Sequence, residues 1–309
     1  MASSFEQIRE RTVIVTLTPN PALDLSHQVD ALVPGTTHRV RTVHERAGGK
    51  GLNVSRVLHQ LGCATLALAP VGGLVGEAFR AELAGSGVPH GLLPVRGGTR
   101  RTVAVVPADG AEPTLLNEPG VPLSDGEWAA LLALLEVTLR QARVLVCSGS
   151  PAGPAERMAD VVRSARAAKV PVIVDTTGEA LLAAARAGAD LLKPNAAELR
   201  EATGIAEPVA AAGKLIAAGA GAVVVSRGPE GLLAVLPDRV VAVAPPRRVA
   251  GNPTGAGDAV VAALARGLAE EQGWEAMLQT AARWSAAAVA APVAGELDLS
   301  VLEPRPSRS

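Results

Sequence analysis

The sequence predicts an α/β fold in which a mostly parallel sheet is covered by helices on both faces and carries a small β flap. Short β-branched runs alternate with alanine-rich stretches along most of the 309 residues, and this alternation is typical of parallel strands joined by crossover helices. Polar residues recur where the predicted strands end, which is where open α/β sheets bind ligands. No linker-like stretch and no internal repeat divides the chain. We therefore expect one domain over residues 1–309.

The first predicted strand is residues 13–17, a β-branched run that ends at two prolines. Asp24 follows at a place where ligand-binding groups are common, although, taken alone, it is better interpreted as a simple turn residue. Residues 25–46 and 95–118 alternate loosely around glycine-containing turns. This pattern predicts two exposed segments of β structure that pair with each other as a flap.

The rest of the chain alternates more regularly. Ser124 and Glu127 have the spacing of a capping box, which predicts the start of a helix. Further strands are expected at residues 65–71, 144–147, 171–175, 190–192 and 222–226, with a hairpin around 237–238. Helices are expected after Asn53, at 76–84, from 124 to about 142, from about 155, through 179–187, at 196–203 and, as a pair, from 258 to about 292.

Composition excludes several classes of protein. Hydrophobic residues make up 48% of the chain and aromatic residues only 2%, so the core is expected to consist mainly of Ala, Val and Leu. A net charge of −1 argues against a nucleic-acid surface, which needs a strong basic excess. Two cysteines cannot form a disulfide framework, the N-terminus lacks the apolar core of a signal peptide, and no apolar run is long enough to span a membrane. We expect a cytoplasmic chain.

A glycine-rich loop at residues 251–258 predicts an anion site. Gly255 and Gly257 lead into an alanine-rich helix that is expected to begin near Asp258. Glycines let several backbone N–H groups point into one concavity, and the first N–H groups of a helix are unpaired and carry the positive end of its dipole. Such a loop suits phosphate oxygens.

Asp258 is unexpected at an anion site, because a carboxylate repels a phosphate. Its presence is explained if it accepts a proton from a hydroxyl that attacks the phosphate. The alternative is that Asp258 is simply the N-cap of the helix, which is a common role for aspartate.

A second glycine cluster, at residues 47–53, also precedes a predicted helix. Its glycines would allow a ligand to approach closely, while Lys50 and Asn53 would offer a charge and an amide. A flexible turn before an amphipathic helix is the alternative. Two such loops in one chain favour a binding site.

Other motifs are missing. Val260 stands where a dinucleotide fingerprint needs its third glycine, so an NAD-dependent oxidoreductase is excluded, and no G-x-x-x-x-G-K-[ST] loop occurs. The five histidines show no metal-ligand spacing.

Six motifs, in order along the chain, resemble those of one family. They are TLTPNPALD, AGGKGLNVSRVLHQLG, SGSPAG, KPNAAEL, VVVSRG and PTGAGDAVVAAL. Over nearly its full length the chain resembles the phosphofructokinase-B branch of the ribokinase-like sugar kinases. The resemblance implies a ribokinase-like three-layer fold whose flap is a β-sheet lid, with ATP and Mg²⁺ as cofactors and a homodimer formed through the lid.

The resemblance also implies a role for each matching residue. The catalytic base is Asp258. The anion-hole amides are those of Gly255, Ala256 and Gly257. The sugar is held by Asp24, Gly49, Lys50 and Asn53, and its existing phosphate by Arg100 together with Arg39. ATP is bound by Lys193, Asn195, Ser226 and Gly228. Glu198 pairs with Asn195 and organises Mg²⁺ through water.

Within the family, the first two motifs are similar to those of the 1-phosphofructokinase and tagatose-6-phosphate kinase subgroup. The chain departs from the usual motifs at Asn252-Pro253, at Pro151-Ala152 and at Thr36-Thr37, where a basic residue is sometimes found. We expect transfer of a phosphoryl group from ATP to a ketohexose monophosphate, with fructose 1-phosphate the leading acceptor. The alternatives are tagatose 6-phosphate, fructose 6-phosphate, or a non-catalytic relative that binds sugar or nucleotide.

Overall fold

The computed structural model describes residues 13–302 except 111, 246–248, 250 and 252. Among these residues, a nine-stranded sheet has the order β13-β12-β11-β10-β9-β8-β1-β4-β5. Neighbouring strands are parallel from β11 to β5, whereas β12 and β13 are antiparallel. The strands are β1 Val13–Leu17, β4 Thr65–Val71, β5 His90–Pro94, β8 Ala142–Ser148, β9 Val172–Asp175, β10 Leu191–Leu192, β11 Ala222–Ser226, β12 Leu232–Val235 and β13 Val240–Val243.

Helices cover both faces of this sheet. One face packs against α2 Lys50–Gln60, α9 Ala256–Ala269 and α10 Trp274–Ala290. The other packs against α4 Asp125–Leu139, α5 Arg157–Ala167, α6 Gly178–Ala187, α7 Ala196–Thr203 and α8 Pro208–Ala217. Successive side chains of a strand point to opposite faces. In β1, Ile14 therefore packs on the face covered by α2, α9 and α10, and Val15 on the face covered by α4 to α8. The three-layer prediction is confirmed.

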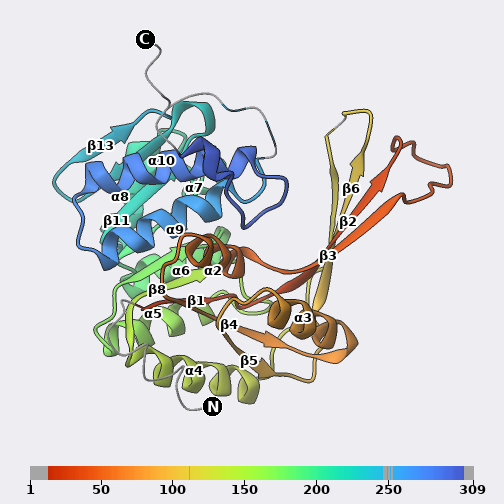
Figure 1. Cartoon of the computed structure of the whole chain (residues 1–309). Coiled ribbons are helices and arrows are strands. Elements are labelled where there is room, and N and C mark those ends of the chain that lie inside the picture. The colour runs from red at the N-terminus through yellow and green to blue at the C-terminus, as the bar shows by residue number, and fades with distance from the viewer. Residues whose placement is uncertain (1–12, 111, 246–248, 250, 252, 303–309) are drawn as a thin grey trace, which may run out of the picture.

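A separate four-stranded sheet forms the lid, with the order β3-β2-β6-β7. Its strands are β2 Ala22–Val29, β3 Thr42–Gly48, β6 Arg100–Pro107 and β7 Thr114–Asn117. The two hairpins are antiparallel, but β2 and β6 are parallel to each other. Figure 1 shows the lid as an arm of strands that leaves the body beside α3 Gly73–Gly85. The expected flap is therefore present, and its strands begin and end within a few residues of the predicted ranges.

Two local differences have clear causes. Helix α8 was not predicted, although Glu207 caps it through the amides of Val209 and Ala210 and Pro208 occupies its first turn. Helix α9 begins at Ala256 rather than at Asp258, because Gly255 adopts a left-handed conformation with a φ of 86° and serves as the N-cap. Asp258 thus lies inside the first turn.

The chain reverses its direction across the sheet between β1 and β8. From β1 the order runs to β4 and β5 on one side, and from β8 to β13 on the other. Ligands of open α/β sheets bind outside the carboxyl ends of the strands at such a switch point. The carboxyl ends of β1, β8 and β9 thus mark the place to look for a site.

No helix of the described residues is long and apolar enough to cross a membrane.

Helices α9 and α10 pack closely at Gly267. A Cβ at this buried position would overlap the Met277 side chain, whereas a Cβ at Gly213 of α8 would meet nothing within 4 Å. We expect Gly267→Ala to lower the free energy of unfolding by about 1–3 kcal/mol through overpacking, although alanine favours the helix itself. Gly213→Ala should instead raise it by about 0.4–1 kcal/mol. Urea denaturation of both variants checks this, and equal stabilisation by both would contradict the close packing.

Candidate active site

Asp258 is buried at the amino-terminal end of α9. Its side chain is 6% exposed and caps no helix amide. Instead, one carboxylate oxygen accepts a hydrogen bond of 2.9 Å from the side-chain amide of Asn53 in α2. The N-cap interpretation of Asp258 is therefore wrong, and the side chain is held by a residue more than 200 positions away.

The pKa of Asp258 is raised to about 7. Burial is the main cause, and the negative charge of Asp175 adds to it, while the Asn53 hydrogen bond and the charges of Lys50 and Lys193 act in the opposite direction. A carboxylate with this pKa exchanges protons readily near neutral pH, which is the property required of a general base.

The backbone amides of the predicted anion-hole loop differ in their hydrogen bonds. The amide of Ala256 donates to the carbonyl of Pro253 at 3.1 Å, so it is already engaged. The amides of Gly257 and Asp258 precede the first intrahelical bond, which Ala259 makes to Gly255 at 3.0 Å. A helix leaves such first-turn amides without partners in the helix, so these two are better placed for an anion than that of Ala256.

The second glycine loop is shaped by the chain itself. A Cβ at Gly48 would overlap the Asp24 carboxylate, and a Cβ at Gly51 would lie 2.6 Å from Thr18 Oγ1. Gly49, the N-cap of α2 with a φ of 111°, is equally crowded by Thr18. The glycines thus allow the segment after β1 to pack against α2, in addition to any ligand they admit.

Asp175, at the end of β9, gathers the cationic groups of the site. Its fully buried carboxylate accepts a hydrogen bond of 2.9 Å from Ser148, which lies beside it in the sheet. Lys193 Nζ is 3.3 Å from one of its oxygens and Lys50 Nζ is 3.6 Å from the other. Burial alone would raise the pKa of Asp175, but the two lysines and the hydrogen bond hold it below its ordinary value.

Sequence reasoning placed Asp175 at a strand end but gave it no role. Lys193 also approaches the anion-hole loop, because a Cβ at Gly257 would lie 3.5 Å from its Nζ. The structure therefore brings Lys50, Lys193 and Asp258 together around Asp175. The ammonium of Lys50 lies within ion-pair distance of two carboxylates, Asp175 and Glu198.

Asn195 and Glu198 form a reciprocal cap at the start of α7. The Glu198 amide donates to Asn195 Oδ1, and the Asn195 amide donates to Glu198 Oε2, each at 2.8 Å. The other carboxylate oxygen, Oε1, lies 3.9 Å from Lys50 Nζ. Asn195 also bridges to Ser226 at the end of β11, and Gly228 starts the short helix that follows. Four predicted residues thus lie along the carboxyl edge of the sheet: Asn195, Glu198, Ser226 and Gly228.

The described residues contain no group of three or more acidic, histidine or cysteine side chains that could hold a metal by themselves. Glu198 Oε1 is one carboxylate oxygen free of the helix cap. A single available carboxylate oxygen suits Mg²⁺, because this ion keeps several waters and is commonly bound by one or two carboxylates together with ligand phosphates.

Asp24 lies on β2 in the lid, at the other end of the site. Its pKa is raised to about 6 by burial, against the lowering effects of Arg100, a hydrogen bond with Thr102, and the charges of Arg46 and Arg56. Three guanidinium groups therefore surround one carboxylate. Three positive charges of this kind suit an anionic part of a ligand.

Arg100 donates hydrogen bonds to neutral acceptors, while the carboxylates of Asp24 and Glu118 act on it only through their charges. Its guanidinium donates at 3.3–3.4 Å to the carbonyls of Asn20 and Glu118 and to the Thr102 hydroxyl, and such long bonds are easily exchanged for a charged partner. Arg39 is exposed in the connection between β2 and β3. The structure brings Arg100 to the site but leaves Arg39 on the lid surface.

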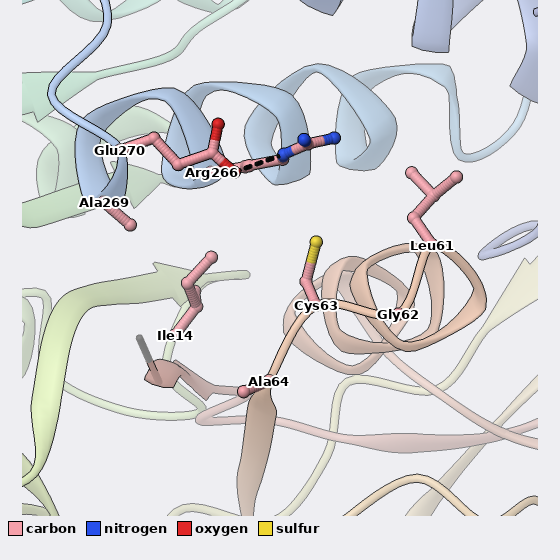
Figure 2. Close-up of a pocket in the computed structure, with 8 residues that line it drawn as sticks. All are labelled: Ile14, Leu61, Gly62, Cys63, Ala64, Arg266, Ala269 and Glu270. Atoms are coloured by element: carbon pink, nitrogen blue, oxygen red, sulfur yellow. Dashed lines mark hydrogen bonds and ion pairs between the residues drawn. The ribbon is translucent and has the colours of Figure 1, made fainter. Parts of the chain in front are cut away.

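A cavity of about 360 Å³ lies elsewhere, beside Ile14 and Cys63. Figure 2 shows the Cys63 thiol pointing from the end of α2 towards the Arg266–Glu270 ion pair of α9. Because Ile14 and Ala64 are near the starts of β1 and β4, this cavity is at the amino edge of the sheet. It is separate from the site described above.

The chain is similar to known proteins over most of its length. The model of the family described as pfkB family carbohydrate kinase matches residues 9–299. The chain is 39% identical over 270 residues to 1-phosphofructokinase of Xanthomonas campestris, with 83% of this chain and 84% of the relative covered. It is 37% identical over 272 residues to ATP-dependent 6-phosphofructokinase isozyme 2 of Mycobacterium tuberculosis, with 84% and 78% covered.

The fold is shared with a solved relative. Phosphofructokinase-2 from Escherichia coli in complex with potassium superimposes with a TM-score of 0.82 at 31% identity, over 90% of this chain and 93% of that one. The family model spans nearly the whole chain, and relatives well above 30% identity cover most of it. The resemblance seen in the motifs is confirmed, and the chain belongs to the pfkB family of carbohydrate kinases.

Proposed function

We propose that the protein transfers the terminal phosphoryl group of ATP to the free primary hydroxyl of a ketohexose monophosphate, with fructose 1-phosphate as the leading acceptor. The observation that carries this proposal is Asp258, a buried carboxylate with a pKa of about 7 at the amino end of α9. It lies between a loop suited to phosphate and a lid that carries cationic groups. The same observation opposes the non-catalytic alternative.

The residues divide the work of phosphoryl transfer. Asp258 removes the proton of the attacking hydroxyl as its oxygen bonds to the γ-phosphorus of ATP and the bond from that phosphorus to the leaving ADP breaks. The amides of Gly257 and Asp258, with Lys193 and Lys50, offset charge on the transferred group, because this reaction depends on positioning and electrostatic stabilisation more than on covalent chemistry. The lid covers the acceptor and excludes water, which would otherwise compete with it.

Mg²⁺ belongs with the ATP phosphates in this proposal. It would neutralise charge on the β- and γ-phosphates, and Glu198 Oε1 would hold it through a water molecule. Asn195, Ser226 and Gly228 lie on the same edge of the sheet and are the proposed ATP contacts.

The preference for fructose 1-phosphate rests on the relatives. The Xanthomonas relative, at 39% identity, is named 1-phosphofructokinase. The Mycobacterium relative is named a 6-phosphofructokinase, and the Escherichia coli enzyme has been solved in complex with fructose 6-phosphate. Fructose 6-phosphate and tagatose 6-phosphate are therefore the alternatives, and Arg100 supports a phosphorylated acceptor in each case.

A panel of acceptors tests the substrate. With MgATP and a coupled assay of ADP release, kcat/KM for fructose 1-phosphate is expected to exceed that for fructose 6-phosphate, tagatose 6-phosphate, fructose and ribose. A preference for a 6-phosphate would keep the mechanism and overturn the acceptor. Absence of ADP release with every sugar, while ATP still binds, would overturn the kinase proposal.

The pH dependence tests the role of Asp258. Because its pKa is raised to about 7, kcat/KM should be constant above neutral pH and fall about tenfold per unit below pH 7 as the carboxylate takes up a proton. Asp258→Asn should lower kcat by about 10²–10⁴-fold. Asp125→Asn removes a carboxylate that is fully exposed on α4 and should leave both quantities unchanged. An Asp258→Asn enzyme with near-normal turnover would exclude this base.

We also propose that the lid joins two copies of the chain. Leu25, Val103 and Leu116 are aligned by the strand register on the lid face opposite Asp24, and Val43 lies on the same face. Leu116 is 58% exposed and Val43 51%. An apolar face of this kind on a projecting sheet indicates a protein interface, and the Escherichia coli relative has been solved in a tetrameric form.

Sedimentation velocity tests the lid interface. The wild-type chain is expected to sediment as a dimer, and Leu116→Asp as a monomer. Val137→Asp, which places the same charge at a 60% exposed valine of α4, should leave the dimer intact. A Leu116→Asp protein that stays dimeric would place the interface elsewhere.

A further inference from the structure

Arg46 faces the same side of the lid sheet as the carboxylate of Asp24. The register pairs Asp24 of β2 with Arg46 of β3 on one side and with Thr102 of β6 on the other. Arg100 lies two residues before Thr102, and residues two apart on a strand face the same way. Arg46 and Arg100 therefore flank Asp24 from strands about 10 Å apart across β2, a separation that two arginine side chains can close around one anion.

Arg46 is held by an acidic residue from a distant segment. Its guanidinium is 3.0 Å from Glu296 Oε1, and their side chains are 20% and 42% exposed. Glu296 follows Gly295, where a Cβ would lie 3.0 Å from Oδ1 of Asn53. Because Asn53 holds Asp258, the Glu296 segment borders the catalytic end of the site.

The third arginine near Asp24 has a different environment. Arg56 is 7% exposed and is fixed by Glu82 at 2.6 Å and by the Ala47 carbonyl at 3.1 Å. Arg56 itself is buried and has a charged partner at short range, so it is a structural group. Arg46 has a half-exposed carboxylate as its partner, and an ion pair this accessible to water contributes little stability.

We propose that Arg46 is a specificity-determining residue that binds the phosphate of the sugar substrate together with Arg100, and that Glu296 holds Arg46 until that phosphate replaces it. The inference rests on the proposed function and adds a residue to its acceptor site. A phosphate dianion offers a guanidinium two charge-assisted hydrogen bonds, which a half-exposed glutamate does not match. A neutral sugar cannot displace Glu296, so the exchange favours phosphorylated acceptors.

The same ion pair could instead serve only to tie the lid to the segment after α10. The two interpretations differ in the direction in which each substitution changes the KM for the sugar phosphate. If the pair is a tie, Arg46→Gln and Glu296→Gln each break it and change the KM for the sugar phosphate in the same direction. If Arg46 binds phosphate, Arg46→Gln weakens substrate binding, whereas Glu296→Gln removes a competing carboxylate and strengthens it.

The experiment measures steady-state kinetics with the preferred sugar phosphate of the wild-type enzyme. We expect Arg46→Gln to raise KM by about tenfold or more with kcat changed less than about twofold, because a charge-assisted bidentate contact is lost. Glu296→Gln should lower KM by about threefold, and the double variant should resemble Arg46→Gln, since the effect of Glu296 acts through Arg46. Arg41→Gln is the matched control, because Arg41 is another lid arginine paired with a carboxylate, Asp30, on the exposed surface.

Equilibrium titration of the wild-type protein and the same four variants with the sugar phosphate and with inorganic phosphate, without ATP, separates the two proposals. Absence of turnover in the wild-type enzyme would contradict the kinase function, whereas anion affinity that falls in Arg46→Gln and rises in Glu296→Gln would still support the role of Arg46. Unchanged KM and unchanged anion affinity in Arg46→Gln, or changes of the same sign in both single variants, would overturn the inference.

Discussion

The buried carboxylate of Asp175 is the constraint on which the catalytic end of the site depends. An ionised carboxylate in the interior is costly unless it is paired, and here Ser148, Lys50 and Lys193 meet it from three parts of the chain. The pairing also fixes the lysines, whose long side chains are otherwise flexible. Because Asp175 engages both, neither lysine neutralises Asp258 outright, and Asp258 keeps a pKa suited to proton transfer. One buried charge thus arranges the cations for the phosphates and preserves the base.

The parallel sheet explains how residues from so many segments meet. The last residues of β8, β9 and β11 are Ser148, Asp175 and Ser226. Lys193 follows the short β10, which lies between β9 and β11 in the sheet. The chain therefore needs no contiguous binding segment. The two glycine loops add the starts of α2 and α9 at the same edge, and the glycines of the loop at residues 47–53 leave room for Thr18 and Asp24 to approach the backbone.

The sequence was informative where function depends on local pattern. The helix caps at Ser124 and Asn195 and the alternation of strands and helices are properties of a few adjacent residues, and the structure has them as predicted. Contacts that depend on pairing between distant strands were not accessible in the same way. Arg39 was expected at the sugar phosphate and Arg46 was not considered, because only the register of β2 with β3 shows which lid arginine lies opposite Asp24. Asp175 was passed over for a similar reason, since its lysine partners come from other segments.

The segment around Gly295 joins the two ends of the site. Gly295 packs against Asn53, which holds Asp258, and the next residue, Glu296, binds Arg46 of the lid. A Cβ at Gly255, the N-cap of α9, would meet Ala294 of the same segment at 2.9 Å. The anion-hole loop, the base and the lid therefore share one short stretch of chain. Under the proposed exchange, acceptor binding would release Glu296 from Arg46, while the packing of Gly295 against Asn53, and with it the hydrogen bond that holds the base, would stay in place.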